Sequence, residues 1–112
     1  MDAEKIEAEV KDLVPLALPR FKLWMLGLQG VEASREVAKL MPGRQGELLV
    51  RAHDDALRLA AMHLMSDLRN ASDHVDLALT ADGCTGELVE RMRYRRDRLG
   101  ELQVAVVRRE RP

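Results

Sequence analysis

Aromatic residues are scarce in this chain of 112 residues, and Phe21, Trp24 and Tyr94 are the whole supply, 3% of the composition. A core without aromatics has to be built from Leu, Ala, Val and Met, which is typical of packed helices rather than of a β-sandwich. Hydrophobic residues make up 46% and charged residues 33%, a balance that excludes a disordered chain. We therefore expect an all-α fold with a single helical domain over residues 1–112.

Cysteine, net charge and long apolar runs are also lacking. The single cysteine, Cys84, cannot form an internal disulfide, which favours the reducing cytoplasm as the location. A net charge of −1 gives no bulk attraction to nucleic acid or to an anionic membrane. The densest apolar stretch, residues 13–28, contains two prolines and is too short to cross a bilayer. We expect a cytoplasmic protein without membrane contact.

Two glycine-containing loops, residues 42–46 and 82–86, divide the chain into three helical parts. In the first part, prolines at 15 and 19 and glycines at 27 and 30 interrupt the pattern and predict helices over residues 3–14, 19–28 and 31–41. The other two parts predict helices over residues 46–81 and 86–107. The expected architecture is a three- to four-helix bundle, or an extended helical hairpin, with one long central helix.

The central helix carries the strongest pattern in the sequence. Its apolar residues recur in alternating steps of four and three: Leu57, Ala61, Leu64, Leu68, Ala71, Val75 and Ala78. This spacing forms a seam that packs against other helices at a shallow angle. A helix of that length spans about 50 Å, long for so short a chain. We therefore expect this helix to protrude, to bend, or to be covered by a second copy, and we favour a homo-oligomer that is most simply a dimer.

A cluster of large apolar residues, Phe21, Trp24, Met25 and Leu28, has two interpretations. Aromatic residues beside a methionine are typical of an exposed hot spot that binds a protein partner. The same residues can equally form the core, because the chain has so few aromatics. We treat them as candidate partner-binding residues, and both interpretations stay open.

An arginine-rich segment follows in the last helix, where Arg91, Arg95 and Arg98 share one face. Such a row of cations can follow a phosphate backbone, which makes nucleic-acid binding an alternative function. In a hairpin folded about residue 83, three acidic residues of the central helix would lie beside these arginines: Asp67, Asp73 and Asp76. Pairing within the chain therefore explains the same pattern without a ligand.

The central helix also contains the segment Arg69-Asn70-Ala71-Ser72-Asp73-His74. It resembles the Arg-x4–6-His motif of the HEPN family, small α-helical ribonuclease domains in which two protomers form the active cleft. The resemblance implies that Arg69 and His74 act at an RNA phosphate, the guanidinium by holding it and the imidazole as acid or base. A ribonuclease or toxin using these two residues is the enzymatic alternative.

Three histidines of the central helix lie on one stripe and raise the question of a metal. Successive histidines are separated by about 15 Å along the axis, so no two of them can bind one ion. A smaller site would combine His63 with Asp67, or Asn70 with His74, and complete the shell with Glu87 or Glu90 from the last helix. The simpler interpretation is a set of polar residues at the edge of the core. We expect no metal and no cofactor.

No phosphate-binding loop, paired CxxC or nucleophile elbow is present in the sequence, so nothing in it indicates an enzyme. The favoured hypothesis is a non-catalytic protein–protein interaction or regulatory protein, of the adaptor or inhibitor kind, acting as a homo-oligomer. The ribonuclease and the nucleic-acid-binding protein are its alternatives.

Overall fold

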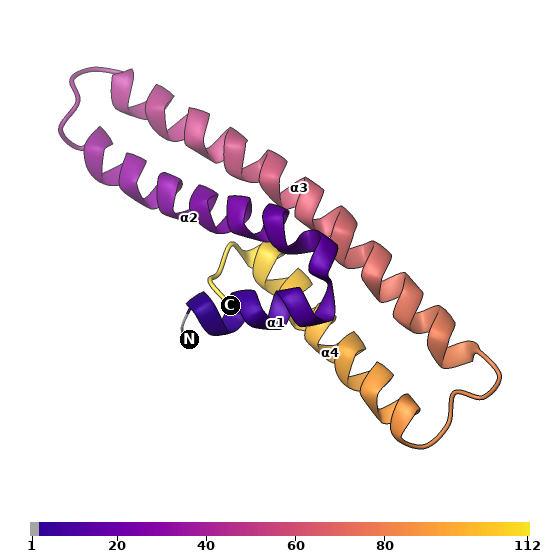
Figure 1. Ribbon diagram of the computed structural model, residues 1–112. Helices are drawn as coiled ribbons and strands as arrows, with labels where there is room; N and C mark the ends of the chain where they lie inside the picture. The colour runs from indigo at the N-terminus through magenta and orange to yellow at the C-terminus, as the bar shows by residue number, and fades with distance from the viewer. Residues whose placement is uncertain (1–2) are drawn as a thin grey trace.

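Four α-helices and one 3-10 turn make up the fold of residues 3–112, the part of the chain that the computed structural model describes (Figure 1). In chain order they are α1 (Ala3–Leu13), η1 (Pro15–Ala17), α2 (Leu18–Ala38), α3 (Gln45–Thr80) and α4 (Glu87–Arg108). The predicted all-α fold with one long central helix is confirmed, since α3 alone has 36 residues. Within these residues, no helix combines the length and the apolarity that crossing a bilayer requires.

Proline separates α1 from α2. Val14, the residue before Pro15, has φ −151° and ψ 75°, because a following proline disfavours the helical region. The chain then continues through η1, with the side chain of Ala17 fully buried, into α2. α1 therefore leaves at an angle and lies across the middle of the molecule instead of extending α2 (Figure 1).

α2 is one continuous helix, so the two helices predicted over residues 19–28 and 31–41 are wrong. Its glycines do not interrupt it but let α3 approach closely. A Cβ atom at Gly27 would lie 3.0 Å from Leu57 Cδ1, and one at Gly30 would lie 3.1 Å from His53 Nδ1. The helix-weakening effect of glycine is offset here by tight packing against the neighbouring helix.

α3 is shared by two antiparallel hairpins, with α2 along its first half and α4 along its second (Figure 1). The central seam residues Leu57, Leu64 and Leu68 are buried, and the other four members of the seam are half-buried. The chain therefore covers the middle of the seam on its own and covers the rest of it in part. α2 and α4 pack one after the other along α3, and each of them covers one half of its seam.

The core lies where the two hairpins meet and α1 crosses them. Ile6 and Val10 of α1 join Trp24 of α2 and Leu99 of α4, and all four are almost completely buried. Away from this middle the molecule thins to two helices at each end (Figure 1). Its extents are 64 × 24 × 19 Å, and its radius of gyration is 17.4 Å. A compact domain of this length has a radius of gyration of about 13 Å, so the fold is a rod.

Candidate functional site

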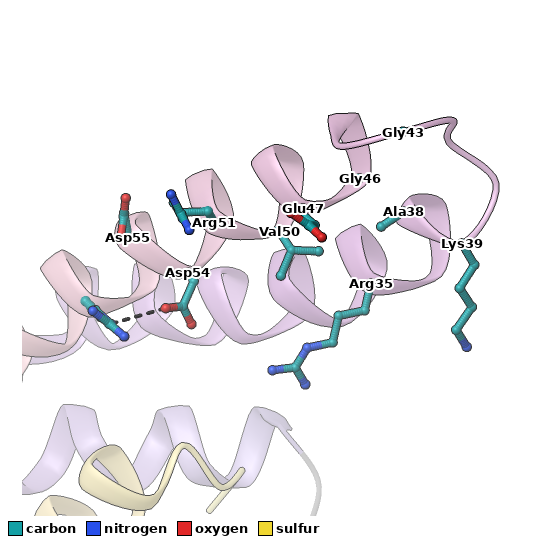
Figure 2. A pocket seen from close by; sticks show the side chains of 11 residues that line it. Arg35, Ala38, Lys39, Gly43, Gly46, Glu47, Val50, Arg51, Asp54 and Asp55 are labelled. Carbon is teal, nitrogen blue, oxygen red and sulfur yellow. Dashed lines mark ion pairs between the residues drawn. The ribbon is translucent and has the colours of Figure 1, made fainter.

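A groove of about 670 Å³ lies at one end of the rod, between the last turns of α2 and the first turns of α3 (Figure 2). Its floor is apolar and small, formed by Ala38, Gly46 and Val50. Gly46 is required there, because a Cβ atom would lie 2.7 Å from the carbonyl oxygen of Ala38. The rim is charged, with four basic residues and three acidic ones: Arg35, Lys39, Arg51, Arg58, Glu47, Asp54 and Asp55.

The charge of Asp54 is held within the chain by two arginines. Arg109 donates a side-chain hydrogen bond to its carboxylate, and Arg58 pairs with it at 3.2 Å, the contact drawn dashed in Figure 2. The hydrogen bond from Arg109 is the main cause that lowers the pKa of Asp54. Arg109 reaches this place because it follows the end of α4 in a left-handed conformation, with φ 56°. The end of α4 is thus tied to α3 at the inner limit of the groove.

The groove offers ionic and apolar contacts but little chemistry. Its lining contains no histidine, cysteine or hydroxyl side chain. A nucleophile with an adjacent base, which covalent catalysis needs, is therefore lacking in this lining. The arrangement is suited to receiving a side chain or a segment of polypeptide.

A second feature is a row of apolar residues on the solvent side of α2, which we name the outer stripe. It continues in steps of three and four from η1 to the turn after α2 and consists of Leu16, Pro19, Leu23, Leu26, Gly30, Ala33, Val37 and Leu40. Leu16 is 90% exposed, Leu23 and Leu26 are each 60% exposed, and Leu40 is 87% exposed. Single exposed leucines are ordinary, but a continuous row of them is typical of a binding surface.

The neighbouring helix extends this apolar surface. Asp54 of α3 faces the end of α4, and Leu59 is turned from it by about 140° at 100° per residue. Leu59, with exposed Ala52 and Ala56, therefore lies on the side of α3 that faces away from α4. On α2, the outer stripe likewise faces away from the core. The two helices together present one apolar face, which we name the α2–α3 face.

The candidate partner-binding residues occupy the opposite side of α2. Phe21, Trp24 and Leu28 are buried, and Met25 is half-buried against the same core. The rings of Phe21 and Trp24 lie 5.9 Å apart at an interplanar angle of 46°. Their interpretation as an exposed hot spot is thus corrected, because α1, α3 and α4 close over them.

The predicted arginine row is largely used inside the protein. Arg98 donates a hydrogen bond to Glu9 at 2.7 Å, which is the main cause that raises the pKa of Arg98. Arg95 reaches the carbonyl oxygens at the end of α1, 3.4 Å from that of Leu13. Arg91 alone remains on the exposed surface, 3.8 Å from Glu87. Two of the three arginines therefore hold α1 in place.

The acidic residues that were expected to pair with these arginines do not do so. Asp67 pairs with Arg20 of α2 at 2.9 Å, not with α4. The expected pairing across the hairpin with Asp73 and Asp76 is likewise not seen, since neither forms an ion pair within residues 3–112. Pairing within the chain does occur, but α1 and α2 take part in it, because they reach the middle of the rod.

Arg69 and His74 both lie on the exposed surface of α3, which is a regular helix through the whole motif. Five residues apart, they are turned from each other by about 140°. Their side chains therefore leave α3 in different directions.

The alternative metal ligands are also separated. His63 and His74 are about 16 Å apart along α3, and Asp67 is bound to Arg20. Among residues 3–112, no three side chains of His, Cys, Asp or Glu are placed to hold one ion.

Sequence reasoning missed both the outer stripe and the groove. The outer stripe has the same step of three and four that identified the seam of α3, so its signal was present in residues 16–40. The groove depends on how far α4 extends along α3, which no local pattern contains.

Comparisons of this chain with protein-family models, with curated proteins and with solved structures found no match. The described surfaces alone therefore indicate the function.

Proposed function

We propose that this protein is a non-catalytic protein–protein interaction protein, of the adaptor or inhibitor kind, that works in the cytoplasm. Its binding surface is the α2–α3 face. The observation that supports this proposal most directly is the outer stripe, a continuous apolar row left exposed on a helix whose other side already forms the core.

Energetics favour this face over the groove as the principal surface. Exposed apolar area is unfavourable by about 25 cal/mol per Å², and burying it against a partner recovers that free energy. In the groove, by contrast, the carboxylate of Asp54 is already satisfied by Arg58 and Arg109. A ligand that binds at Asp54 would have to replace contacts that exist, whereas a partner on the α2–α3 face adds new ones.

Two matched variants test the proposal. Leu26→Glu places a charge in the outer stripe, and Leu77→Glu places one on an exposed leucine, 67% accessible, near the far end of α3. We expect Leu26→Glu to abolish association with protein, measured by light scattering for self-association and by pull-down from the native host for other partners. Leu77→Glu should leave both unchanged. Association that is absent from the unmodified protein, or that survives Leu26→Glu, would overturn the proposal.

The ribonuclease alternative is tested on the same preparations. We expect RNA to stay intact when it is incubated with the protein. Cleavage that is lost in Arg69→Ala and in His74→Ala would replace the interaction proposal by the enzymatic one.

The nucleic-acid-binding alternative depends on Arg91 and its neighbours on α4. We expect no DNA or RNA binding at low salt, because Arg95 and Arg98 are engaged with α1. Salt-sensitive binding that falls in an Arg91→Ala variant would favour that alternative.

A further inference from the structure

We infer that the occupant of the outer stripe is the α2 helix of a second copy of this chain, running antiparallel. This inference depends on the proposed function, since it names the partner of the same surface.

In the middle of one antiparallel register, large residues of the outer stripe lie opposite small ones. When two rows with steps of three and four pack antiparallel, a position that follows a step of three on one helix lies opposite a position that follows a step of four on the other. One register joins all eight positions of the stripe in four kinds of layer, each of which occurs twice: Leu16 with Leu40, Pro19 with Val37, Leu23 with Ala33, and Leu26 with Gly30. In the two central kinds of layer a leucine lies over a residue with one side-chain carbon or none. Two α2 helices can therefore approach closely there, and Leu26 also meets His53 of α3, which lies beside Gly30.

The same register brings opposite charges together. Lys22, Gln29 and Glu36 are spaced by seven residues along one border of the stripe. In the register above, Lys22 of each copy meets Glu36 of the other, and Gln29 meets its own equivalent on the two-fold axis. Lys22 forms no ion pair within residues 3–112, and Glu36 pairs only with Lys39 on the exposed surface of the same helix. Lys22 is thus free to pair across the interface, and Glu36 can exchange its exposed pair with Lys39 for a pair with Lys22.

The area of the α2–α3 face is of the size that a dimer needs. From position 16 to position 40 the stripe is about 36 Å long. With α3 beside α2 at an interaxial distance of about 9 Å, the face is about 20 Å wide, or about 700 Å² in projection. Stable complexes bury about 800 Å² per partner. Two copies of this face form a four-helix arrangement with closed two-fold symmetry.

Oligomeric state is the first test, measured by sedimentation equilibrium over a range of concentrations. We expect a dimer for the unmodified protein. Leu26→Glu should weaken it by roughly 100-fold, since every dimer loses two buried leucines. Leu77→Glu should leave the dimer unchanged. A protein that is monomeric at all concentrations overturns the inference. If such a monomer still binds a host protein in a way that Leu26→Glu abolishes, the proposed function stands without it.

Charge reversal tests the register. Lys22→Glu places like charges opposite each other at two symmetric positions and should weaken the dimer roughly tenfold. The double variant Lys22→Glu with Glu36→Lys restores both pairs and should recover the affinity. In a parallel dimer Lys22 would meet Lys22, and the single change would not weaken it. A Lys22→Glu dimer as tight as the unmodified one, or a double variant that stays weak, overturns the antiparallel register.

Crosslinking gives an independent readout of direction. In a Cys84→Ser background, Gln29→Cys should crosslink to itself with a short bismaleimide, because this position lies on the axis. Lys22→Cys should not crosslink to itself, since the two equivalents lie about 21 Å apart, but it should crosslink to Glu36→Cys in a mixture. Self-crosslinking of Lys22→Cys together with failure of the mixed pair would show a parallel dimer and overturn the inference.

Discussion

The two sides of α2 both carry apolar residues in steps of three and four, but one side is buried and the other is exposed. On the inner side, Ala17, Phe21, Trp24, Leu28 and Val31 step by four and three into the core, and all are buried. On the outer side, the stripe from Leu16 to Leu40 repeats this spacing and stays largely exposed. Apolar periodicity therefore identifies surfaces that pack, and the rest of the fold decides which of them packs within the chain.

The largest difference between the two sides is expected in the free energy of unfolding, when one large side chain on each side is truncated to alanine. Trp24→Ala removes a fully buried indole and should lower the free energy of unfolding by about 3–5 kcal/mol. Leu26→Ala, two residues away on the outer side, should change it by less than about 0.5 kcal/mol. Urea denaturation followed by far-UV circular dichroism measures both, at a concentration low enough for the chain to be monomeric. Equal losses would contradict the assignment of an inner and an outer side.

A second pair of variants tests how far the tight packing of α2 on α3 continues toward the groove. Gly46→Ala places a Cβ atom within 3.0 Å of the Cβ of Ala38 and should destabilise the fold by about 1–3 kcal/mol. Gly100→Ala in α4 meets nothing within 4 Å and should stabilise it by about 0.5–1 kcal/mol. Thermal unfolding distinguishes the signs. A stabilising Gly46→Ala would show that the two helices separate before the groove.

The smallest effect concerns the pH dependence of stability, at the ion pair between Asp54 of α3 and Arg109. Because Arg109 lowers the pKa of Asp54 in the folded protein, the ion pair stabilises the fold fully above the unfolded pKa of about 3.9. This stabilisation is lost as the pH falls through the lower folded value. We expect Asp54→Asn to be less stable near neutral pH and to lose less stability on acidification than the unmodified protein. Asp55→Asn is the control, because it removes the same charge from a residue that forms no ion pair within residues 3–112. Parallel pH profiles for both variants would contradict the role of Arg109.

Local patterns were sufficient for most helix boundaries but not for the contacts between helices. The long helix expected over 46–81 occupies Gln45–Thr80, because its ends coincide with glycine-containing loops. The error at residues 19–41 arose because Gly27 and Gly30 were judged by helix propensity, whereas their effect depends on Leu57 and His53 of another helix. Propensity is a local quantity, and close helix packing is not.

The candidate site was harder to predict for a related reason. Both stripes of α2 satisfy the same periodicity, so the sequence alone cannot say that Trp24 is inside and Leu26 outside. Trp24 is buried because α1 packs over its side of α2, and the contact between Arg98 and Glu9 holds α1 there. A contact between residues 89 positions apart leaves no trace in a local pattern.

The sharing of α3 between two hairpins has a consequence for motion. Its middle, around Leu64 and Leu68, is enclosed by the core, while beyond Ala71 it is supported by α4 alone and its apolar residues are only half-buried. Amides in such thinly supported segments open locally at a lower free energy than those of the core. Backbone hydrogens of residues 71–95 should therefore exchange with deuterium well before those of residues 57–68. One uninterrupted helix would then behave as two units: the part of α3 enclosed by the core stays folded, while the part beyond Ala71 opens and closes independently.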